Sequence, residues 1–373
     1  MPTYTAPRGT TDVLPEEQVY WRYVRGAADR MATLYGYQPI DIPMFEEVGV
    51  FERGIGEGTD IVEKEMFLLQ PRTEEARRYA LRPEPTAGIC RAYVERGMAS
   101  LPAPLRLCWC GPVFRYDRPQ AGRLRQFTQI DVEAIGSDDP ALDAEIILYA
   151  WRLCESLGLR NLRLLVNSVI GDPAAREPYV AALREYFRPY VDTLDADDQV
   201  RFQKNPLRIL DSKSERTHTL LEGAPDIQEW LPPAGRDHFE RLQSYLRTAG
   251  VSYTIDKRLV RGLDYYTHTV FEIVPPEAGQ QGTLCAGGRY DRLVELFGGT
   301  PTPAVGMGSG IERLILNLKA QGIEPSPLPR PSVYVAIASP AAAEAGFALA
   351  DELRRVGVAT QLSAGAQSLR AQL

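Results

Sequence analysis

Two long strand-like segments joined by a short polar loop constrain this chain more than any other feature. The segments are Leu105–Tyr116 and Leu124–Glu133, and the loop Asp117–Arg123 contains Pro119 and Gly122. Such a loop predicts a hairpin connection somewhat longer than a tight turn. The two strands are therefore expected to pair antiparallel, and the fold is expected to contain an antiparallel sheet.

The second strand collects polar side chains on one face, because alternate residues of a strand point to opposite sides of a sheet. That face receives Phe127, Gln129, Asp131 and Glu133, and the other receives Ile130 and Val132. Five arginines surround the loop against one acid, Asp117: Arg106, Arg115, Arg118, Arg123 and Arg125. Guanidinium groups suit phosphate because they donate two parallel hydrogen bonds. One interpretation is a polar, phosphate-bearing ligand; the other is an antiparallel sheet with one solvated face.

The composition excludes several classes of protein. The 373 residues suffice for two or three domains, with 44% apolar and 24% charged residues. No apolar run is long enough to cross a bilayer, and the N-terminus has no apolar segment, so neither a membrane span nor a secretion signal is expected. The net charge of −7 argues against a broadly basic nucleic-acid surface. Five cysteines, an odd number, indicate reduced thiols and a cytoplasmic location.

Three further segments contain glycine and arginine, and the first two of them also contain aromatic residues. They are Leu259–Glu272, Cys285–Leu293 and Ala304–Arg313. In the first, strand alternation predicts that Tyr265 and Tyr266 point to opposite faces. In the third, glycine at positions 306, 308 and 310 removes the side chains from one strand face. Such a face leaves room for a flat ligand or for close backbone packing, and the residues alone favour neither.

Other catalytic arrangements do not fit this chain. Cys108 and Cys110 lack a second pair at zinc-site spacing, and the three histidines are scattered along the sequence. Neither a G-x-S-x-G segment nor a Walker-type phosphate loop occurs. Glu84 and Thr86 precede a helix, where Thr86 is a candidate N-cap and the pair also suits an amino-acid ligand.

The order of the elements predicts a division into domains. Residues 1–324 mix helices and strands, beginning with a helix that Asp12 is expected to cap and Gly36 to end. Within them, residues 171–250 lose the strand pattern and are expected to form a helical subdomain. Four prolines predict a linker over 325–331, and a strand–helix–strand pattern follows over 332–373. Too few residues follow to complete a parallel sheet, so the chain is expected to end inside this last domain.

In this order the segments resemble the histidyl-tRNA synthetases, a family of class II aminoacyl-tRNA ligases, along essentially the whole chain. The three motifs shared by class II enzymes are similar to Pro43–Glu47, Gly111–Glu133 and Gly306–Arg313. The family's own histidine signatures, which are more specific, resemble Leu259–Glu272 and Ala286–Asp291. The resemblance implies an α+β fold: an antiparallel sheet flanked by helices, a helical insertion at 171–250 and a partial anticodon-binding-like α/β domain at 332–373.

Residue by residue, the resemblance implies two groups of ligands. Histidine would be bound by Glu84, Thr86 and Gln129 at its α-amino end and by Glu133, Tyr265 and Tyr266 around its imidazole ring. ATP would be bound by Arg115, Arg123, Arg261 and Arg313, with Arg115 and Arg261 as the catalytic residues at its α-phosphate. A carboxylate nucleophile needs no general base, so fixed guanidinium groups that stabilise the charge developing on phosphorus suffice.

The implied reaction makes histidyl-adenylate from histidine and ATP, with Mg²⁺ bridging the phosphates, and then charges the 3′ end of tRNA(His). Motif 1 implies a homodimer. One alternative is the synthetase-like regulatory subunit of ATP phosphoribosyltransferase, which shares the catalytic core without the ligase activity, and another is a nucleotide-binding module with no ligase activity. The intact segment 261–266 and the residues after 332 favour the ligase. Asp117 stands where motif 2 usually has Glu, so the resemblance leaves its role open.

Overall fold

The computed structural model describes residues 4–56, 59, 61–70, 73, 77–120, 122–212, 214–260, 265–275, 282–363 and 368–372. The chain forms two compact units, Met1–Glu324 and Pro325–Leu373. No helix in the described ranges is long and apolar enough to cross a membrane.

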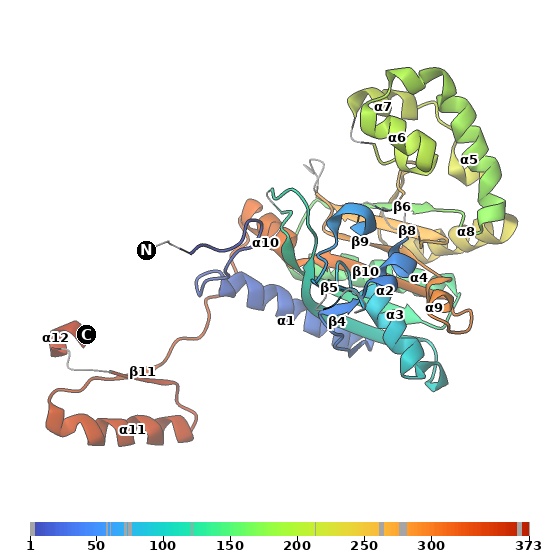
Figure 1. Cartoon of the computed structure of the whole chain (residues 1–373). Coiled ribbons are helices and arrows are strands. Elements are labelled where there is room, and N and C mark those ends of the chain that lie inside the picture. The colour runs from blue at the N-terminus through green and yellow to red at the C-terminus, as the bar shows by residue number, and fades with distance from the viewer. Residues whose placement is uncertain are drawn as a thin grey trace. The chain divides into compact units, whose positions relative to one another are not determined.

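The first unit is built on an eight-stranded sheet with helices on its faces (Figure 1). In spatial order the strands are β1 (Gln38–Pro39), β4 (Leu105–Phe114), β5 (Gln126–Ile135), β10 (Ala304–Gly310), β9 (Cys285–Arg289), β8 (Thr269–Val274), β6 (Arg163–Ser168) and β7 (Thr254–Ile255). Neighbouring strands are antiparallel except at the two edges, where β1 and β7 pair parallel. The predicted hairpin is the β4–β5 pair, in register from Leu105 opposite Ile135 to Phe114 opposite Gln126.

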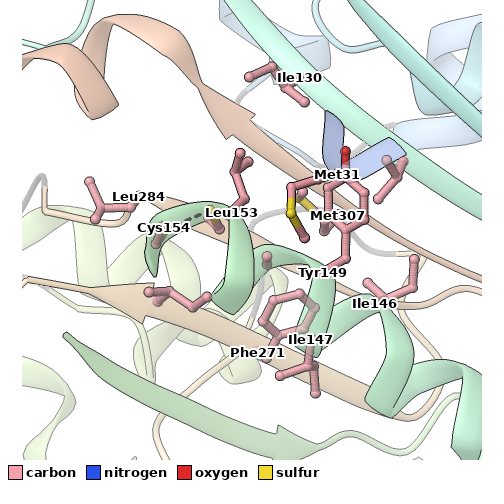
Figure 2. Close-up of a cluster of buried hydrophobic side chains, with 14 of the residues drawn as sticks. Met31, Ile130, Ile146, Ile147, Tyr149, Leu153, Cys154, Phe271, Leu284 and Met307 are labelled. Carbon is pink, nitrogen blue, oxygen red and sulfur yellow. Dashed lines mark hydrogen bonds between the residues drawn. The ribbon is translucent and has the colours of Figure 1, made fainter. Parts of the chain in front are cut away.

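One face of the sheet is covered by the main hydrophobic core. Its helices are α1 (Gln18–Tyr35), α4 (Pro140–Ser156), α8 (Pro233–Thr248) and α10 (Ile311–Ala320). Ile130 and Val132 of β5 point into this core, as alternation predicts. Figure 2 shows Met31, Ile130 and Phe271 gathered around the buried Tyr149 of α4.

The other face of the sheet packs on shorter elements. They are α2 (Val48–Ile55), the π-helix η1 (Ile61–Glu65), α3 (Thr86–Glu95), η2 (Met98–Ser100) and α9 (Leu293–Leu296), with the two-stranded ribbon of β2 (Phe45–Glu47) and β3 (Tyr79–Leu81). Leu107 and Trp109 of β4 pack here with Ile89 and Tyr93 of α3. Gln129, Asp131 and Glu133 share this face with Leu107 and Trp109, because they are their cross-strand neighbours or lie two residues along.

A group of short helices forms a separate cluster at one end of the sheet (Figure 1). It contains α5 (Pro173–Phe187), η3 (Arg188–Thr193), α6 (Ala196–Lys204), η4 (Pro206–Ile209), α7 (Glu215–Leu221) and η5 (Ile227–Trp230). Its own buried residues run from Ile170 to Leu231. Helix α8 instead packs on α4 through Phe239, Leu242 and Leu246, which belong to the main core.

The start of the first helix differs from the prediction. Helix α1 begins at Gln18, and its N-cap is Glu17, whose side chain makes no capping bond, so Asp12 does not cap it. Backbone turns from Leu14 and Pro15 precede the helix and delay its start. The end is as predicted, because Gly36 at φ 73° donates its N–H to the carbonyls of Ala32 and Thr33.

The second unit contains the predicted strand–helix–strand order. Its elements are β11 (Val333–Val335), η6 (Pro340–Ala342), α11 (Ala343–Arg355), β12 (Thr360–Leu362) and α12 (Leu369–Gln372). Strands β11 and β12 pair parallel, with α11 as the connection between them.

Candidate active site

A cavity of about 320 Å³ opens on the face of the sheet that carries α3. It brings together nine of the ten predicted ligand residues: Glu84, Thr86, Arg115, Arg123, Gln129, Glu133, Tyr265, Tyr266 and Arg313. The tenth, Arg261, lies outside the described residues. The grouping agrees with a common site, and the individual roles remain predictions.

Strands β5 and β10 form the floor of this cavity. Gln129, Asp131 and Glu133 of β5 stand directly opposite Gly310, Gly308 and Gly306 of β10. A Cβ atom at Gly306 would lie 1.7 Å from Glu133 Oε2, and one at Gly308 would lie 2.5 Å from Asp131 Oδ1. The glycines therefore admit close packing of the polar side chains of β5, and room for a flat ligand on this face stays a prediction.

Glu133 lines the cavity and is 2% exposed. Its Oε1 accepts a hydrogen bond from the Thr86 hydroxyl at 2.7 Å, and its Oε2 accepts a short one from the Tyr290 hydroxyl. Burial raises the pKa of Glu133 to about 8, although the two hydroxyl donors oppose that shift. A carboxyl group of this kind can hold a proton or accept one from a nitrogen ligand near neutral pH.

Glu84 organises the start of helix α3. Its carboxylate accepts from the backbone N–H groups of Thr86 and Ala87, each at 2.8 Å. The residue at the N-cap is Pro85, so the capping function proposed for Thr86 belongs to Glu84, and the Thr86 hydroxyl is free to bind Glu133. Burial raises the pKa of Glu84.

Tyr265 and Tyr266 line the cavity together, so the prediction of opposite faces was wrong. Their ring centroids are 4.7 Å apart, and Tyr265 also meets the Tyr290 ring edge-on at 5.6 Å. Strand β8 begins only at Thr269, so these tyrosines precede the strand and strand alternation does not apply to them.

Three arginines also line the cavity. Arg115 donates from Nε to the Pro83 carbonyl at 2.8 Å and lies over the Phe127 ring. Arg123 pairs closely with Asp117 and, at 3.6 Å, with Glu65. Arg313 donates to the carbonyls of Gly122 and Thr283, each at 3.1 Å. These contacts hold three guanidinium groups in place around one opening.

The other loop arginines do not reach the cavity. Arg106 pairs with Glu145 of α4 at 2.9 Å, and Arg125 lies over the Tyr116 ring. Arg118 is exposed. The five-arginine cluster of the sequence therefore contributes only two members, Arg115 and Arg123, because strand length and loop direction separate the rest.

Tyr290, Asp131 and Glu312 are among the cavity residues that were not predicted as ligands. Tyr290 and Asp131 lie inside recognised segments, and periodicity did place Asp131 on the polar face. Glu312 accepts from the Thr128 backbone N–H at 2.8 Å, and burial raises its pKa to about 7. Glu312 lies inside the recognised segment Gly306–Arg313, but nothing in that segment predicted its contact with Thr128, which is 184 residues away in the chain.

The fold brings two of the three histidines together. His238 and His268 stack with ring centroids 5.4 Å apart, and His238 contacts Asp143 at 3.1 Å. Asp143 also holds the buried Arg289, which directly precedes Tyr290. Within the described ranges no group of three His, Cys, Asp or Glu side chains is placed to hold a metal ion.

A mostly antiparallel sheet with flanking helices and a cavity lined by buried carboxyl groups and by arginines is the arrangement of a class II aminoacyl-tRNA synthetase fold. The family model described as histidyl-tRNA synthetase matches residues 9–314. The chain therefore belongs to the histidyl-tRNA synthetase family, whose members are ATP-dependent aminoacyl-tRNA ligases.

Individual relatives agree with this family. The histidine–tRNA ligase of Dehalococcoides mccartyi is 49% identical over 370 residues, covering 99% of this chain and 88% of that protein. The apo histidyl-tRNA synthetase of S. aureus superposes with a TM-score of 0.79 at 35% identity, covering 99% of this chain and 87% of that one. A Bacillus halodurans protein described as an ATP phosphoribosyltransferase regulatory subunit/histidyl-tRNA synthetase shares the fold, with a TM-score of 0.70 at 23% identity and coverage of 99% and 95%.

Proposed function

We propose that this chain is a histidine–tRNA ligase that makes histidyl-adenylate from histidine and ATP and then charges tRNA(His). The observation that carries the proposal is a single cavity that brings the buried carboxyl groups of Glu84 and Glu133 together with Arg115, Arg123 and Arg313. The carboxyl groups suit the ammonium group and imidazole ring of histidine, and the guanidinium groups suit the nucleotide phosphates. The 49% identity to a histidine–tRNA ligase supports the same assignment.

The Glu133 carboxyl group and Tyr266 would bind the two imidazole nitrogens of histidine, with Tyr265 against the ring. Glu84, Thr86 and Gln129 would lie around the α-amino end. Thr86 and Tyr290 supply hydroxyl donors that fix the position of Glu133, because each holds one of its oxygens. A site that hydrogen-bonds a polar ring rejects apolar isosteres, since its buried groups would be left unpaired.

Beside the arginines of the cavity, the histidine carboxylate would attack the α-phosphorus of ATP, and pyrophosphate would leave. Arg115 would stabilise the charge that develops there, with Arg261 opposite it by family resemblance. Carbonyl contacts at Pro83, Gly122 and Thr283 hold Arg115 and Arg313 in position before the substrate arrives. Such preorganised donors stabilise a transition state without a reorganisation cost.

Mg²⁺ is proposed as the ion that accompanies ATP. This ion is usually held by phosphates, water and one or two carboxylates rather than by a complete protein cage. Asp117 and Glu312 line the same cavity and supply carboxylate oxygens. When bound, the ion would neutralise phosphate charge and orient the leaving group.

Three further assignments complete the proposal. Motif 1 resemblance supports a homodimer, and the absence of disulfides among the five cysteines is compatible with a cytoplasmic role in protein synthesis. Residues 1–324 would be the catalytic domain, 171–250 its helical insertion, 325–331 a linker and 332–373 a partial anticodon-binding-like domain. Asp117, in place of the usual Glu, would position Arg123 through their ion pair.

The decisive experiment is ATP–pyrophosphate exchange with and without histidine, followed by charging of tRNA(His) transcript. A histidine–tRNA ligase exchanges pyrophosphate only when histidine is present. The regulatory-subunit alternative predicts histidine binding with no exchange, and that result would reject the ligase.

A further inference from the structure

Asp131 is a buried carboxylate to which the proposed function assigns no role. It is 4% exposed, and its Oδ2 atom has no hydrogen-bond partner among the residues that the structure describes. The Oε1 atom of Gln129, two residues along the same strand, is buried and unpartnered in the same way. Both side chains line the cavity. Two orphaned acceptors in one site are costly unless a donor arrives with the ligand.

The two side chains occupy adjoining space above one glycine. A Cβ atom at Gly308 would lie 2.5 Å from Asp131 Oδ1 and 2.9 Å from Gln129 Nε2. Glycine at this position keeps that space open. The carboxylate of Asp131 and the side-chain amide of Gln129 therefore border the same space, and each also carries an unpartnered oxygen.

The surroundings of Asp131 favour a cation. Burial raises the pKa of Asp131 well above its ordinary range, and the neighbouring Glu133 and Glu84 raise it further. Arg115 and Arg82 act in the opposite direction without cancelling the shift. A positively charged donor would relieve this repulsion, because opposite charges stabilise the ionised carboxylate.

The residues first expected to hold the amino group are partly engaged already. Both Glu84 oxygens accept backbone N–H groups of helix α3, and the Thr86 hydroxyl donates to Glu133. The α-ammonium group of histidine carries three donors and a positive charge, which matches the unpartnered oxygens. We propose that Asp131, together with Gln129, binds the α-ammonium group of histidine. This inference rests on the proposed function and adds a specificity residue to it.

The test compares two ligands that differ only at the amino group. L-Histidine carries an ammonium group, and L-imidazolelactic acid carries a hydroxyl in its place. For Asp131→Asn, we expect the Kd for histidine, measured by calorimetry, to rise by about 10- to 100-fold, the range for a hydrogen bond to a charged group. The Kd for imidazolelactic acid should change by less than about threefold, because the variant keeps an acceptor for a hydroxyl.

Glu133→Gln is the matched control, since it removes a neighbouring charge from the same strand face. It should weaken both ligands alike, because both carry the imidazole ring. Equal losses of both ligands in Asp131→Asn, or no loss of either, would overturn the inference. If Asp131→Asn does not fold, the wild-type protein decides: a preference for histidine over imidazolelactic acid below about threefold contradicts a charged ammonium site. Failure of the wild-type protein to bind histidine at all would instead reject the proposed function.

Discussion

At the scale of single residues, Glu133 shows how burial sets chemistry. Strand alternation brings it to the cavity, but its properties come from two hydroxyl groups, Thr86 and Tyr290, that reach it from other parts of the chain. Both of its oxygens are engaged and almost no water reaches it. It is therefore a preorganised acceptor for one donor of defined position, which is what discrimination between amino acids requires.

Replacing Glu133 with Ala should raise the KM for histidine far more than the KM for ATP in pyrophosphate exchange. The expected rise for histidine is on the order of tenfold or more, because a hydrogen bond to a charged group is lost. Glu145→Ala is the matched control, since Glu145 pairs with Arg106 and lies outside the cavity. Equal effects of Glu133→Ala on both substrates would contradict the assignment of Glu133 to the imidazole ring.

The same residue makes a prediction for stability against pH. Burial raises the pKa of Glu133 from 4.5 to about 8, so between these values the folded protein holds a proton that the unfolded chain has released. The contribution of Glu133 to the free energy of unfolding therefore falls as the pH rises through this window. Glu133→Gln lacks this titrating group. Between pH 5 and pH 8, its free energy of unfolding in denaturant should therefore fall by at least about 1 kcal/mol less than that of the wild-type protein. Parallel curves for the two proteins would show that Glu133 does not titrate there.

At the scale of elements, the β5–β10 pair decides the shape of the site. Polar side chains on one strand face glycines on the next, so the sheet carries its own recess without a break in its hydrogen bonding. Arg82 strengthens the adjoining edge: this buried guanidinium donates to the carbonyls of Pro112 and Ile42 and lies over Trp109. The floor of the cavity is thus formed by regular strands, and Arg123, Tyr265 and Tyr266 reach it from outside the strands.

Replacing Gly306 with Ala should abolish histidine-dependent exchange. The new Cβ would lie 1.7 Å from Glu133 Oε2 and 2.8 Å from the Val132 carbonyl, so the carboxylate has to leave its position. The cost in stability is about 1–3 kcal/mol, as for other overpacked sites, measured by denaturant unfolding. Gly49→Ala in helix α2 is the control, because a Cβ there meets nothing within 4 Å, and it should keep full exchange activity. Normal histidine-dependent exchange by Gly306→Ala would show that this part of the floor tolerates a side chain.

At the scale of the whole molecule, the chain forms two compact units, and we expect them to divide the two steps of the reaction between them. The nine predicted ligands that the structure places line a cavity within Met1–Glu324. The proline-rich residues 325–331 begin the second unit, in which Phe347 of α11 and Val356, the residue after its end, are exposed. Adenylation should therefore be a property of the first unit alone.

Truncation after Leu328 should leave histidine-dependent pyrophosphate exchange within about twofold of the full chain, since no predicted ligand is removed. Charging of tRNA should be weaker than in the full chain, because the residues proposed as an anticodon-binding-like domain are lost. Exchange and charging are measured on the same two preparations. Loss of exchange on truncation would place the tail in the catalytic fold.

The proposed homodimer has a direct measurement. Light scattering at micromolar concentration should give about twice the chain mass of 41.5 kDa. A monomer that still makes histidyl-adenylate would remove the dimer from the proposal.

The sequence by itself determined the elements of this protein. Strand alternation and the polar loop predicted the β4–β5 hairpin and its polar face, and the residue pattern after 332 predicted the strand–helix–strand order of β11, α11 and β12. These are local properties, because a strand or helix shows its buried face in the spacing of its own residues. Only the tertiary structure decided that Tyr290 reaches Glu133, that Tyr265 and Tyr266 share one cavity, and that Glu84 caps α3. Such contacts depend on which segments meet in space, and the spacing of residues within one segment carries no information about its partner.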